Sequence, residues 1–151
     1  KILKKSVLWI LDRVVIASAL GAVFIRVGNF FNSEMIGKPT EEGFSLAIIF
    51  RQFDSIPRHP GQLYEAFGYV FVFLSLFFLY WKTKKSTQTG FLFGLFLVLL
   101  MSVRVVVEQF KIAQIDSRED WILGLNTGQV LSVPFLIIGL YFMFLYKPKA
   151  D

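Results

Sequence analysis

Apolar residues gather in four long runs, at residues 6–25, 66–81, 90–107 and 130–146, and short polar segments separate them. At a rise of 1.5 Å per residue, helices of about 16–20 residues are roughly 24–30 Å long, close to the hydrocarbon thickness of a bilayer. The pattern therefore predicts an all-α integral membrane protein with four transmembrane helices. We expect residues 1–151 to form a single membrane domain.

The longest polar segment, residues 38–58, predicts a small extracytoplasmic cap. Within it, residues 44–50 are rich in β-branched and aromatic side chains with partial alternation, which is typical of one or two short strands.

Inside the apolar runs, the isolated glycines Gly68, Gly94 and Gly139 predict close helix packing. Asp12 and Arg13 interrupt the first run, where we expect local pairing or snorkelling to the interface.

Composition supports a membrane protein and narrows its chemistry. Hydrophobic residues make up 55% of the chain and charged residues only 18%, against about 25% in an ordinary soluble domain. The chain has no cysteine and one histidine, which excludes a thiolate nucleophile and a His-rich metal cluster within it. We expect no metal and no cofactor. The net charge of +5 does not indicate a nucleic-acid partner, because the basic residues are confined to short segments between apolar runs.

The distribution of lysine predicts the orientation in the membrane. One set of ends carries Lys1, Lys4, Lys5, Lys82, Lys84, Lys85, Lys147 and Lys149, whereas the opposite loops are slightly acidic. The positive-inside rule then places both termini and the 82–89 connection in the cytoplasm. With that orientation, polar residues from all four predicted helices converge on the outer leaflet, and charged groups at a membrane boundary mark a site by default.

Arg26 is the first candidate at this outer end. On a continuing helix, Arg26, Asn29, Ser33 and Glu34 fall within an arc of about 140°. A guanidinium matches a phosphate bidentately, so this face is suited to a phosphate ligand. The alternative is an arginine that snorkels beside a Gly-Asn turn at the end of the helix.

The third and second runs bring further charges to the same end. Arg104 and Glu108 are spaced i and i+4 and can pair, either as a structural ion pair or as a phosphate-binding arginine held by its carboxylate. Glu65 is a candidate for orienting an arginine. His59 either acts in the site or hydrogen-bonds its own turn. Gln129 either contacts a head group or, with Asn126, caps the fourth helix.

At this point the motifs resemble those of prolipoprotein diacylglyceryl transferase. The resemblance follows the whole chain in order, through Arg26-x-Gly28-Asn29-Phe30-x-Asn32-x-Glu34-x-x-Gly37, Arg58-His59-Pro60-x-Gln62-Leu63-Tyr64-Glu65, Arg104-x-x-x-Glu108 and Gly128-Gln129-x-Leu131-Ser132.

The resemblance implies a bacterial inner-membrane enzyme. Members move the diacylglyceryl group of phosphatidylglycerol onto the lipobox cysteine of a preprolipoprotein, releasing glycerol phosphate and forming a thioether. On this basis we predict catalytic roles for Arg26, Glu65, Arg104 and Glu108. We predict substrate-binding roles for Arg26, Asn29, Glu34, Gly37, Arg58, His59, Gln62 and Gln129.

The chain also departs from the family pattern. Members usually have glycine before the signature arginine, where this chain has Ile25, and they have seven spans with an upstream His-Gly motif. We therefore expect the chain to be the C-terminal portion of a seven-span protein, with the base for the thiol in the other portion, and to be inactive by itself. Two other interpretations stay open, a non-catalytic lipid-binding subunit and a transporter segment with Arg104 and Glu108 as a gating pair.

Overall fold

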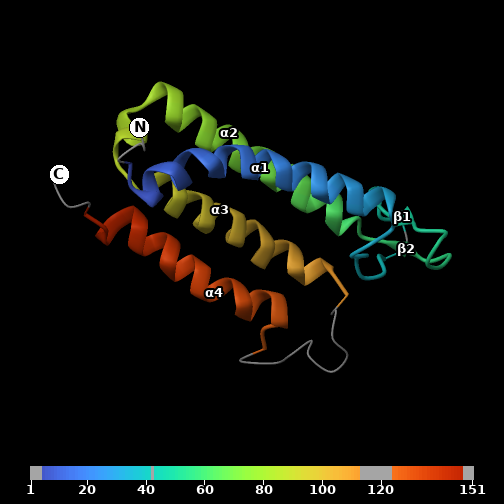
Figure 1. Cartoon of the computed structure of the whole chain (residues 1–151). Coiled ribbons are helices and arrows are strands. Elements are labelled where there is room, and N and C mark those ends of the chain that lie inside the picture. The colour runs from blue at the N-terminus through green and yellow to red at the C-terminus, as the bar shows by residue number, and fades with distance from the viewer. Residues whose placement is uncertain (1–4, 42, 113–123, 148–151) are drawn as a thin grey trace.

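The computed structural model describes residues 5–41, 43–112 and 124–147, and these form four long helices in antiparallel succession (Figure 1). The helices are α1 (Val7–Phe31), α2 (Gly61–Lys82), α3 (Phe91–Val107) and α4 (Thr127–Leu140). Short turns extend them, namely the 3-10 turns η1 (Lys84–Thr87) and η2 (Glu108–Phe110) and a π-helical turn, η3 (Tyr141–Leu145). The start of α1, the α2–α3 connection and the end of η3 lie at one end of the bundle, and the strands lie at the other.

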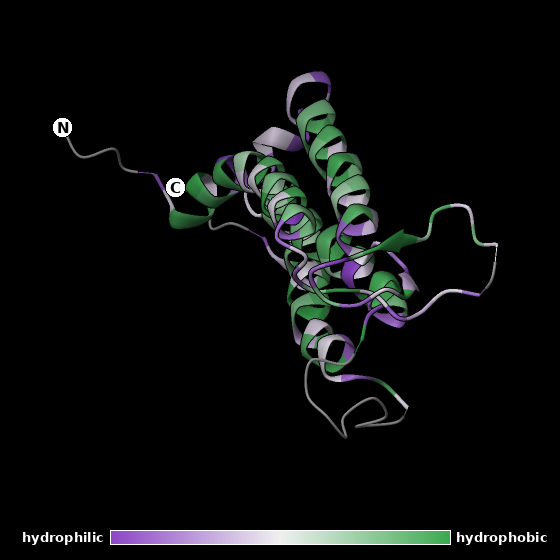
Figure 2. Ribbon diagram, turned by 90° about the vertical axis from the view of Figure 1, so that its right-hand side faces the viewer, coloured by the Kyte–Doolittle hydropathy of each residue, from purple (hydrophilic) through white to green (hydrophobic). Residues whose placement is uncertain are grey.

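All four helices are long and apolar enough to cross a membrane, counting η2 with α3 and η3 with α4, which confirms the predicted class. Figure 2 shows apolar residues along the lengths of the helices and polar ones mainly at their ends. Large side chains such as Phe67 (80% exposed), Phe24 (67%) and Phe144 (70%) cover the outside. A soluble bundle would bury them, whereas lipid tails solvate them.

Two helices reach further than the apolar runs predict. α1 continues to Phe31 instead of ending near Ile25, and α2 begins at Gly61 instead of Ala66. The additional turns are polar, and their side chains find partners between the helices. Arg26 and Glu65 are consequently held on rigid helical backbone.

α3 is the central helix, because it packs against α1, α2 and α4. The core at this junction consists of Ala19, Val72, Leu76, Phe91 and Leu92.

The predicted role of the three glycines is confirmed. A Cβ added to Gly94 would lie 2.6 Å from the carbonyl oxygen of Gly139, and one added to Gly139 would lie 2.7 Å from that of Gly94. At Gly68 an added Cβ would lie 2.5 Å from Cγ1 of Val103. The helix backbones can approach this closely only because these positions lack side chains.

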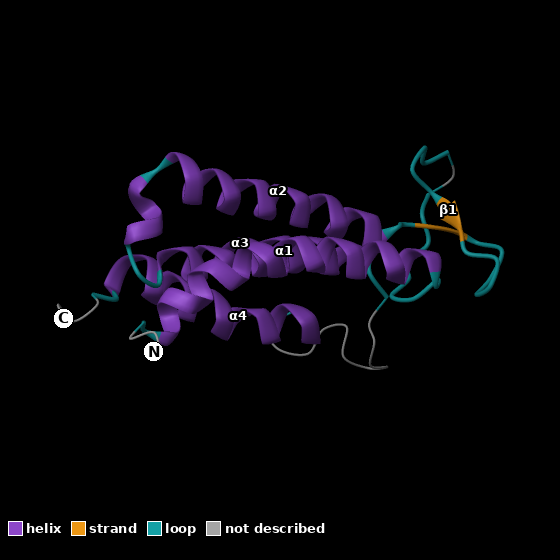
Figure 3. Cartoon of the chain, turned by 45° about the horizontal axis from the view of Figure 1, so that its top comes forward, coloured by secondary structure: helices purple, strands orange, loops and turns teal. Residues whose placement is uncertain are grey.

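A small cap sits beyond one end of the bundle (Figure 3). Its two short strands, β1 (Ile48–Ile49) and β2 (Pro57–Arg58), pair antiparallel, as predicted for this segment. The strand is shorter than the sequence pattern over 44–50 indicates, because the backbone turns before it, with Ala47 N donating to Phe44 O at 3.1 Å. Single bridges join Pro39 to β2 and Gly37 to Lys111.

The prediction of local pairing at Asp12 is wrong. Its carboxylate is 1% exposed and accepts from the backbone N–H groups of Gly90 (2.6 Å) and Phe93 (2.8 Å), so it caps the first turn of α3. Arg13 does stay local, since it donates to Trp9 O at 2.7 Å and its guanidinium lies 3.5 Å from the centre of the Trp9 ring. The first backbone N–H groups of α3 have no acceptor within the helix, and the buried carboxylate of Asp12 takes the place of water as their acceptor.

Candidate functional site

Glu65 is the centre of the polar cluster at the capped end of the bundle. It projects from the first turns of α2 and is 0% exposed. Its Oε2 lies 2.9 Å from Nε of Arg26 on α1, and its Oε1 lies 2.8 Å from Nζ of Lys111, just after η2. Both contacts are close ion pairs whose angles lie outside those of hydrogen bonds. One buried carboxylate therefore holds two cations from different parts of the chain, as a buried charge requires.

The cluster continues toward α4. Nζ of Lys111 lies 3.7 Å from Oε2 of Glu108, and the Glu108 carboxylate packs against Gly128 in the first turn of α4. We call Arg26, Glu65, Lys111 and Glu108 the ion network. Its charges alternate in sign along the chain of contacts, so each buried charge has a neighbour of the opposite sign.

Asn29 and Glu34 flank Arg26. With the Asn29 amide oriented so that its neighbours are satisfied, its oxygen accepts from Nη1 of Arg26 at 3.1 Å. Its nitrogen then donates to Ile25 O at 3.2 Å and to Oε2 of Glu34 at 3.3 Å. The guanidinium is thus oriented by a carboxylate on one side and a carboxamide on the other.

The continuing helix predicted for this stretch is only partly correct. Arg26 and Asn29 share a face of α1, but the helix ends at Phe31 and does not include Ser33 or Glu34. Ser33 (φ 53°) and Met35 (φ 57°) have left-handed backbone, and the chain turns back so that Glu34 N donates to Asn29 O at 2.9 Å. Glu34 therefore reaches Asn29 through a tight turn, which we call the 33–37 turn.

Arg104 lies in the last turn of α3 and does not pair with Glu108, contrary to the prediction from their spacing. The backbone N–H of Glu108 still donates to Arg104 O, but the Glu108 carboxylate lies beside Lys111 and Gly128 instead. Nε of Arg104 is buried and has no hydrogen-bond partner in the part of the chain that the structure describes. A buried donor without a partner is unusual in a native structure and needs an explanation.

Tyr69 joins this arrangement one turn after Glu65. It is 3% exposed, its hydroxyl is hydrogen-bonded to the side chain of Arg26, and it lies within electrostatic range of both Glu65 and Arg104. Both arginines therefore lie near one buried phenol. Arg26 has its partners, whereas Arg104 keeps an unused donor.

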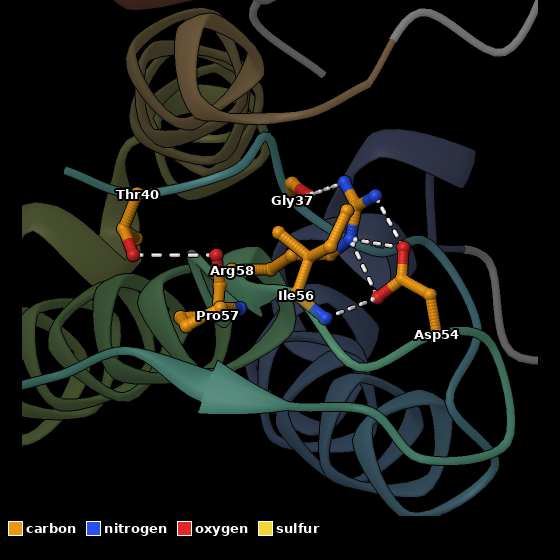
Figure 4. A network of polar contacts seen from close by, with 6 residues as sticks. All are labelled: Gly37, Thr40, Asp54, Ile56, Pro57 and Arg58. Carbon is orange, nitrogen blue, oxygen red and sulfur yellow. Dashed lines mark hydrogen bonds and ion pairs between the residues drawn. The ribbon is translucent and has the colours of Figure 1, made fainter. Parts of the chain in front are cut away.

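Arg58 serves the cap. Figure 4 shows its guanidinium between Asp54 and the backbone of Gly37. Nη2 lies 2.5 Å and Nε 3.0 Å from Oδ2 of Asp54, and Nη1 donates to Gly37 O at 3.3 Å. The hydrogen bond from Arg58 holds the pKa of Asp54 below its ordinary value. Arg58 thus connects the 33–37 turn to the loop between β1 and β2.

His59 and Gln62 also support the 33–37 turn. Nδ1 of His59 lies 3.1 Å from the hydroxyl of Tyr64, which is the local hydrogen bond left open in the sequence analysis. Its backbone carbonyl packs so closely on Gly37 that no Cβ would fit there. Nε2 of Gln62 donates to the carbonyl of Glu34, while its buried Oε1 has no partner among the described residues.

Gln129 caps α4. Its backbone N–H donates to Oδ1 of Asn126 at 2.9 Å, and its Oε1 accepts from Asn126 N at 3.1 Å, which together form a capping box. Its Nε2 donates to Val105 O at 3.1 Å, so the start of α4 is fixed to the end of α3.

Lys111 and Tyr69 were not among the predicted site residues. Lys111 follows Glu108 at i+3. Tyr69 follows Glu65 at i+4 and was read as part of an apolar run. Helical spacing from a known site residue was the available signal in both cases.

A cavity of about 470 Å³ opens beside the ion network. It lies between the 33–37 turn and the segment after η2, and its lining combines apolar side chains with one cation and one carboxylate. The lining residues are Ser33, Glu34, Met35, Ile36, Phe53, Lys111 and Ile112.

The fold and site define a multi-pass helical membrane protein with a buried, arginine-containing polar site at one end of the bundle. The chain belongs to the prolipoprotein diacylglyceryl transferase family, whose model matches residues 1–145. It is similar to the phosphatidylglycerol–prolipoprotein diacylglyceryl transferases of Tolumonas auensis (46% identical over 144 residues, 95% of this chain and 54% of the relative) and Bacteroides fragilis (44% over 148 residues, 98% and 52%). The corresponding enzyme of Chloroherpeton thalassium is 45% identical over 148 residues, covering 98% of this chain and 54% of the relative. The chain thus spans about half the length of the curated relatives it matches.

Proposed function

We propose that this chain supplies the phosphatidylglycerol-binding site of a prolipoprotein diacylglyceryl transferase. The enzyme transfers the diacylglyceryl group of phosphatidylglycerol to the lipobox cysteine of a preprolipoprotein and releases glycerol phosphate. Family membership and the names of the relatives support the substrates. The observation that carries the proposal is the pair of arginines around Tyr69, one held by Glu65 and the other with an unused buried donor.

The chemistry of the reaction explains why two arginines are needed. The thiol gives up its proton to a base, and the thiolate attacks the glycerol carbon that bears the phosphate. A C–S bond forms, the C–O bond to the phosphate breaks, and its electron pair leaves with glycerol phosphate. Negative charge grows on the phosphate oxygens in the transition state, so preorganised donors in a water-poor site accelerate the step.

The arginines and the glutamates of the site have different roles in this step. Arg26 presents its guanidinium in a fixed orientation, because Glu65 and Asn29 hold it. Arg104 supplies the second set of donors, and its unpartnered Nε is the group that a phosphate oxygen would satisfy. Glu108 acts on Lys111 rather than on Arg104. These assignments give Glu65 and Glu108 orienting roles.

The remaining predicted site residues would act through the 33–37 turn and the start of α4. Gln62, Arg58 and His59 each hold the turn that carries Glu34 and Gly37. The turn lines the cavity beside Lys111, where the lipid head group or the peptide would enter. Gln129 would contribute by fixing α4 against α3.

We further propose that the protein lies in the bacterial inner membrane with the described chain ends in the cytoplasm and the site at the outer leaflet. The antiparallel order of the helices brings the lysine-rich ends together and the ion network to the opposite end.

The test reconstitutes the intact protein with phosphatidylglycerol and a lipobox peptide and measures glycerol phosphate release. Arg26→Ala and Arg104→Ala should each slow release by roughly 10²–10³-fold, the range for removing a preorganised charge-stabilising donor. Arg13→Ala is the matched control, because this guanidinium stacks on Trp9 far from the ion network and should leave the rate unchanged. Parental rates for both site variants would overturn the proposal.

A further inference from the structure

Gly128 leaves the space that the Glu108 carboxylate occupies. A Cβ at Gly128 would lie 2.5 Å from both Cδ and Oε1 of Glu108 and 2.9 Å from Oε2. The backbone of Gly128 is helical, so a side chain there would be opposed by the nearby Glu108 carboxylate and not by its own φ. A side chain at this position would therefore have to displace the Glu108 carboxylate from its place.

The contact between Gly128 and Glu108 is held in place from both sides. Nδ2 of Asn126 donates to Glu108 O at 3.3 Å, and Nε2 of Gln129 donates to Val105 O at 3.1 Å. The first turn of α4 is thereby fastened to the end of α3 on either side of the carboxylate. A carboxylate at a helix N-terminus is also favoured by the helix dipole.

Glu108 is one end of the ion network, and Arg26 is the other. Glu108 lies 3.7 Å from Lys111, Lys111 lies 2.8 Å from Glu65, and Glu65 lies 2.9 Å from Arg26. The contacts run from α4 through the end of α3 and through α2 to α1. If Glu108 moves away, Lys111 loses part of its attraction to that carboxylate and interacts more strongly with Glu65. The interaction of Glu65 with Arg26 then weakens.

We propose that Gly128 is a positioning residue for the lipid-phosphate site, acting through Glu108, Lys111 and Glu65 on the guanidinium of Arg26. The proposal rests on the proposed function, because the phosphate of phosphatidylglycerol is the ligand that Arg26 would hold. It assigns to the start of α4 a task in the site, although among the described residues no ion pair or hydrogen bond joins an α4 side chain to Arg26 or Arg104.

The experiment compares three glycine variants of the intact protein. Gly128→Ala adds a methyl group against Glu108. Gly139→Ala adds one against the backbone of α3 at the other half of the same helix pair, and Gly21→Ala adds one where nothing lies within 4 Å. Each is tested for glycerol phosphate release as a function of phosphatidylglycerol concentration and for its melting temperature in detergent.

We expect Gly128→Ala to lower kcat/KM for phosphatidylglycerol by roughly 10- to 100-fold, the effect of misplacing a catalytic group by about 1 Å. Gly139→Ala should lower the melting temperature at least as much as Gly128→Ala does, while its kcat/KM stays within about threefold of the parental value. Gly21→Ala should change neither quantity. Equal losses of kcat/KM in Gly128→Ala and Gly139→Ala would overturn the proposal, because the effect would then follow helix packing in general.

A double-mutant cycle keeps the proposal separable from the proposed function. Gly128→Ala is combined with Glu108→Ala, which removes the carboxylate that the new methyl group would meet. The melting-temperature loss of Gly128→Ala should disappear in the Glu108→Ala background, whether or not the protein transfers lipid. An unchanged loss would overturn the positioning role. If the cycle shows this coupling but the parental protein releases no glycerol phosphate, the proposed function is overturned instead.

Discussion

Nζ of Lys111 lies 2.8 Å from Oε1 of Glu65, so a residue beyond the end of α3 is bound to the first turns of α2. Both side chains are buried, with 6% and 0% of their surface exposed. The opposite oxygen of the same carboxylate binds Arg26. Glu65 consequently joins three segments that are distant in the sequence. Its negative charge compensates the positive charges of Arg26 and Lys111 away from water.

Removing that charge should destabilise the protein strongly. In Glu65→Gln the side chain keeps its shape, but Arg26 and Lys111 face each other across a neutral amide. Loss of one partner from a buried ion pair costs about 3–5 kcal/mol, and we expect a loss of unfolding free energy in that range. Denaturant unfolding in detergent measures it.

Glu41→Gln is the matched control for this experiment, because Glu41 is exposed in the cap. It should change the unfolding free energy by less than about 0.5 kcal/mol. Equal stability of the Glu65→Gln protein and the parental protein would show that the carboxylate does not hold the two cations.

Lys111 should be replaceable by arginine but not by methionine. Lys111→Met keeps the length of the side chain and removes the ammonium, which leaves Glu108 without its cation and Glu65 with Arg26 alone. We expect a destabilisation of about 3 kcal/mol. Lys111→Arg keeps the charge and should recover most of the loss. Lys38→Met, at an exposed lysine of the same end, is the control and should behave as the parental protein in the same thermal melts.

The membrane class and the gathering of polar residues at one end of the bundle could be predicted from the sequence because both depend on local patterns. The length of an apolar run decides whether a helix crosses the bilayer, and arginines, carboxylates and carboxamides gathered at one end of the helices indicate a polar cluster there. Arg26 and Glu65 were found in this way, and the structure places them 2.9 Å apart. The glycines of α3 and α4 were found because an isolated glycine in an apolar helix has few other uses.

The contacts of Glu108 and Asp12 could not be predicted because they depend on how other segments pack against them. Arg104 and Glu108 keep the i,i+4 backbone hydrogen bond of an α-helix, but the Glu108 carboxylate is drawn to Lys111 and to the space that Gly128 leaves on α4. Asp12 accepts from the backbone N–H groups of Gly90 and Phe93, which every residue except proline offers. The contact of Asp12 with α3 and that of Glu108 with Gly128 join segments that are distant in the sequence, so spacing along one segment does not reveal them.

The close approach of α3 and α4 should be sensitive to a single methyl group. Gly139→Ala places a Cβ 2.7 Å from the carbonyl oxygen of Gly94, which is backbone and cannot turn aside. Overpacking of this kind costs about 1–3 kcal/mol, which we expect to appear as a lower melting temperature in detergent. Gly21→Ala, in open space on α1, should melt with the parental protein. If both variants melt alike, the two glycines do not set the helix spacing.

The cap should loosen in acid through Asp54. Because the hydrogen bond from Arg58 lowers the pKa of the Asp54 carboxyl below its ordinary value of 3.8, the folded cap favours the charged form. The stabilisation is therefore complete above the ordinary pKa and is lost as the pH falls through the lower pKa of the folded cap. Amide hydrogen exchange around Gly37 and β2, corrected for its intrinsic pH dependence, should show protection that declines below about pH 4. Asp54→Asn should be less protected at neutral pH and should show no decline in that window. Protection that falls equally in both proteins would mean that another group controls the acid response of the cap.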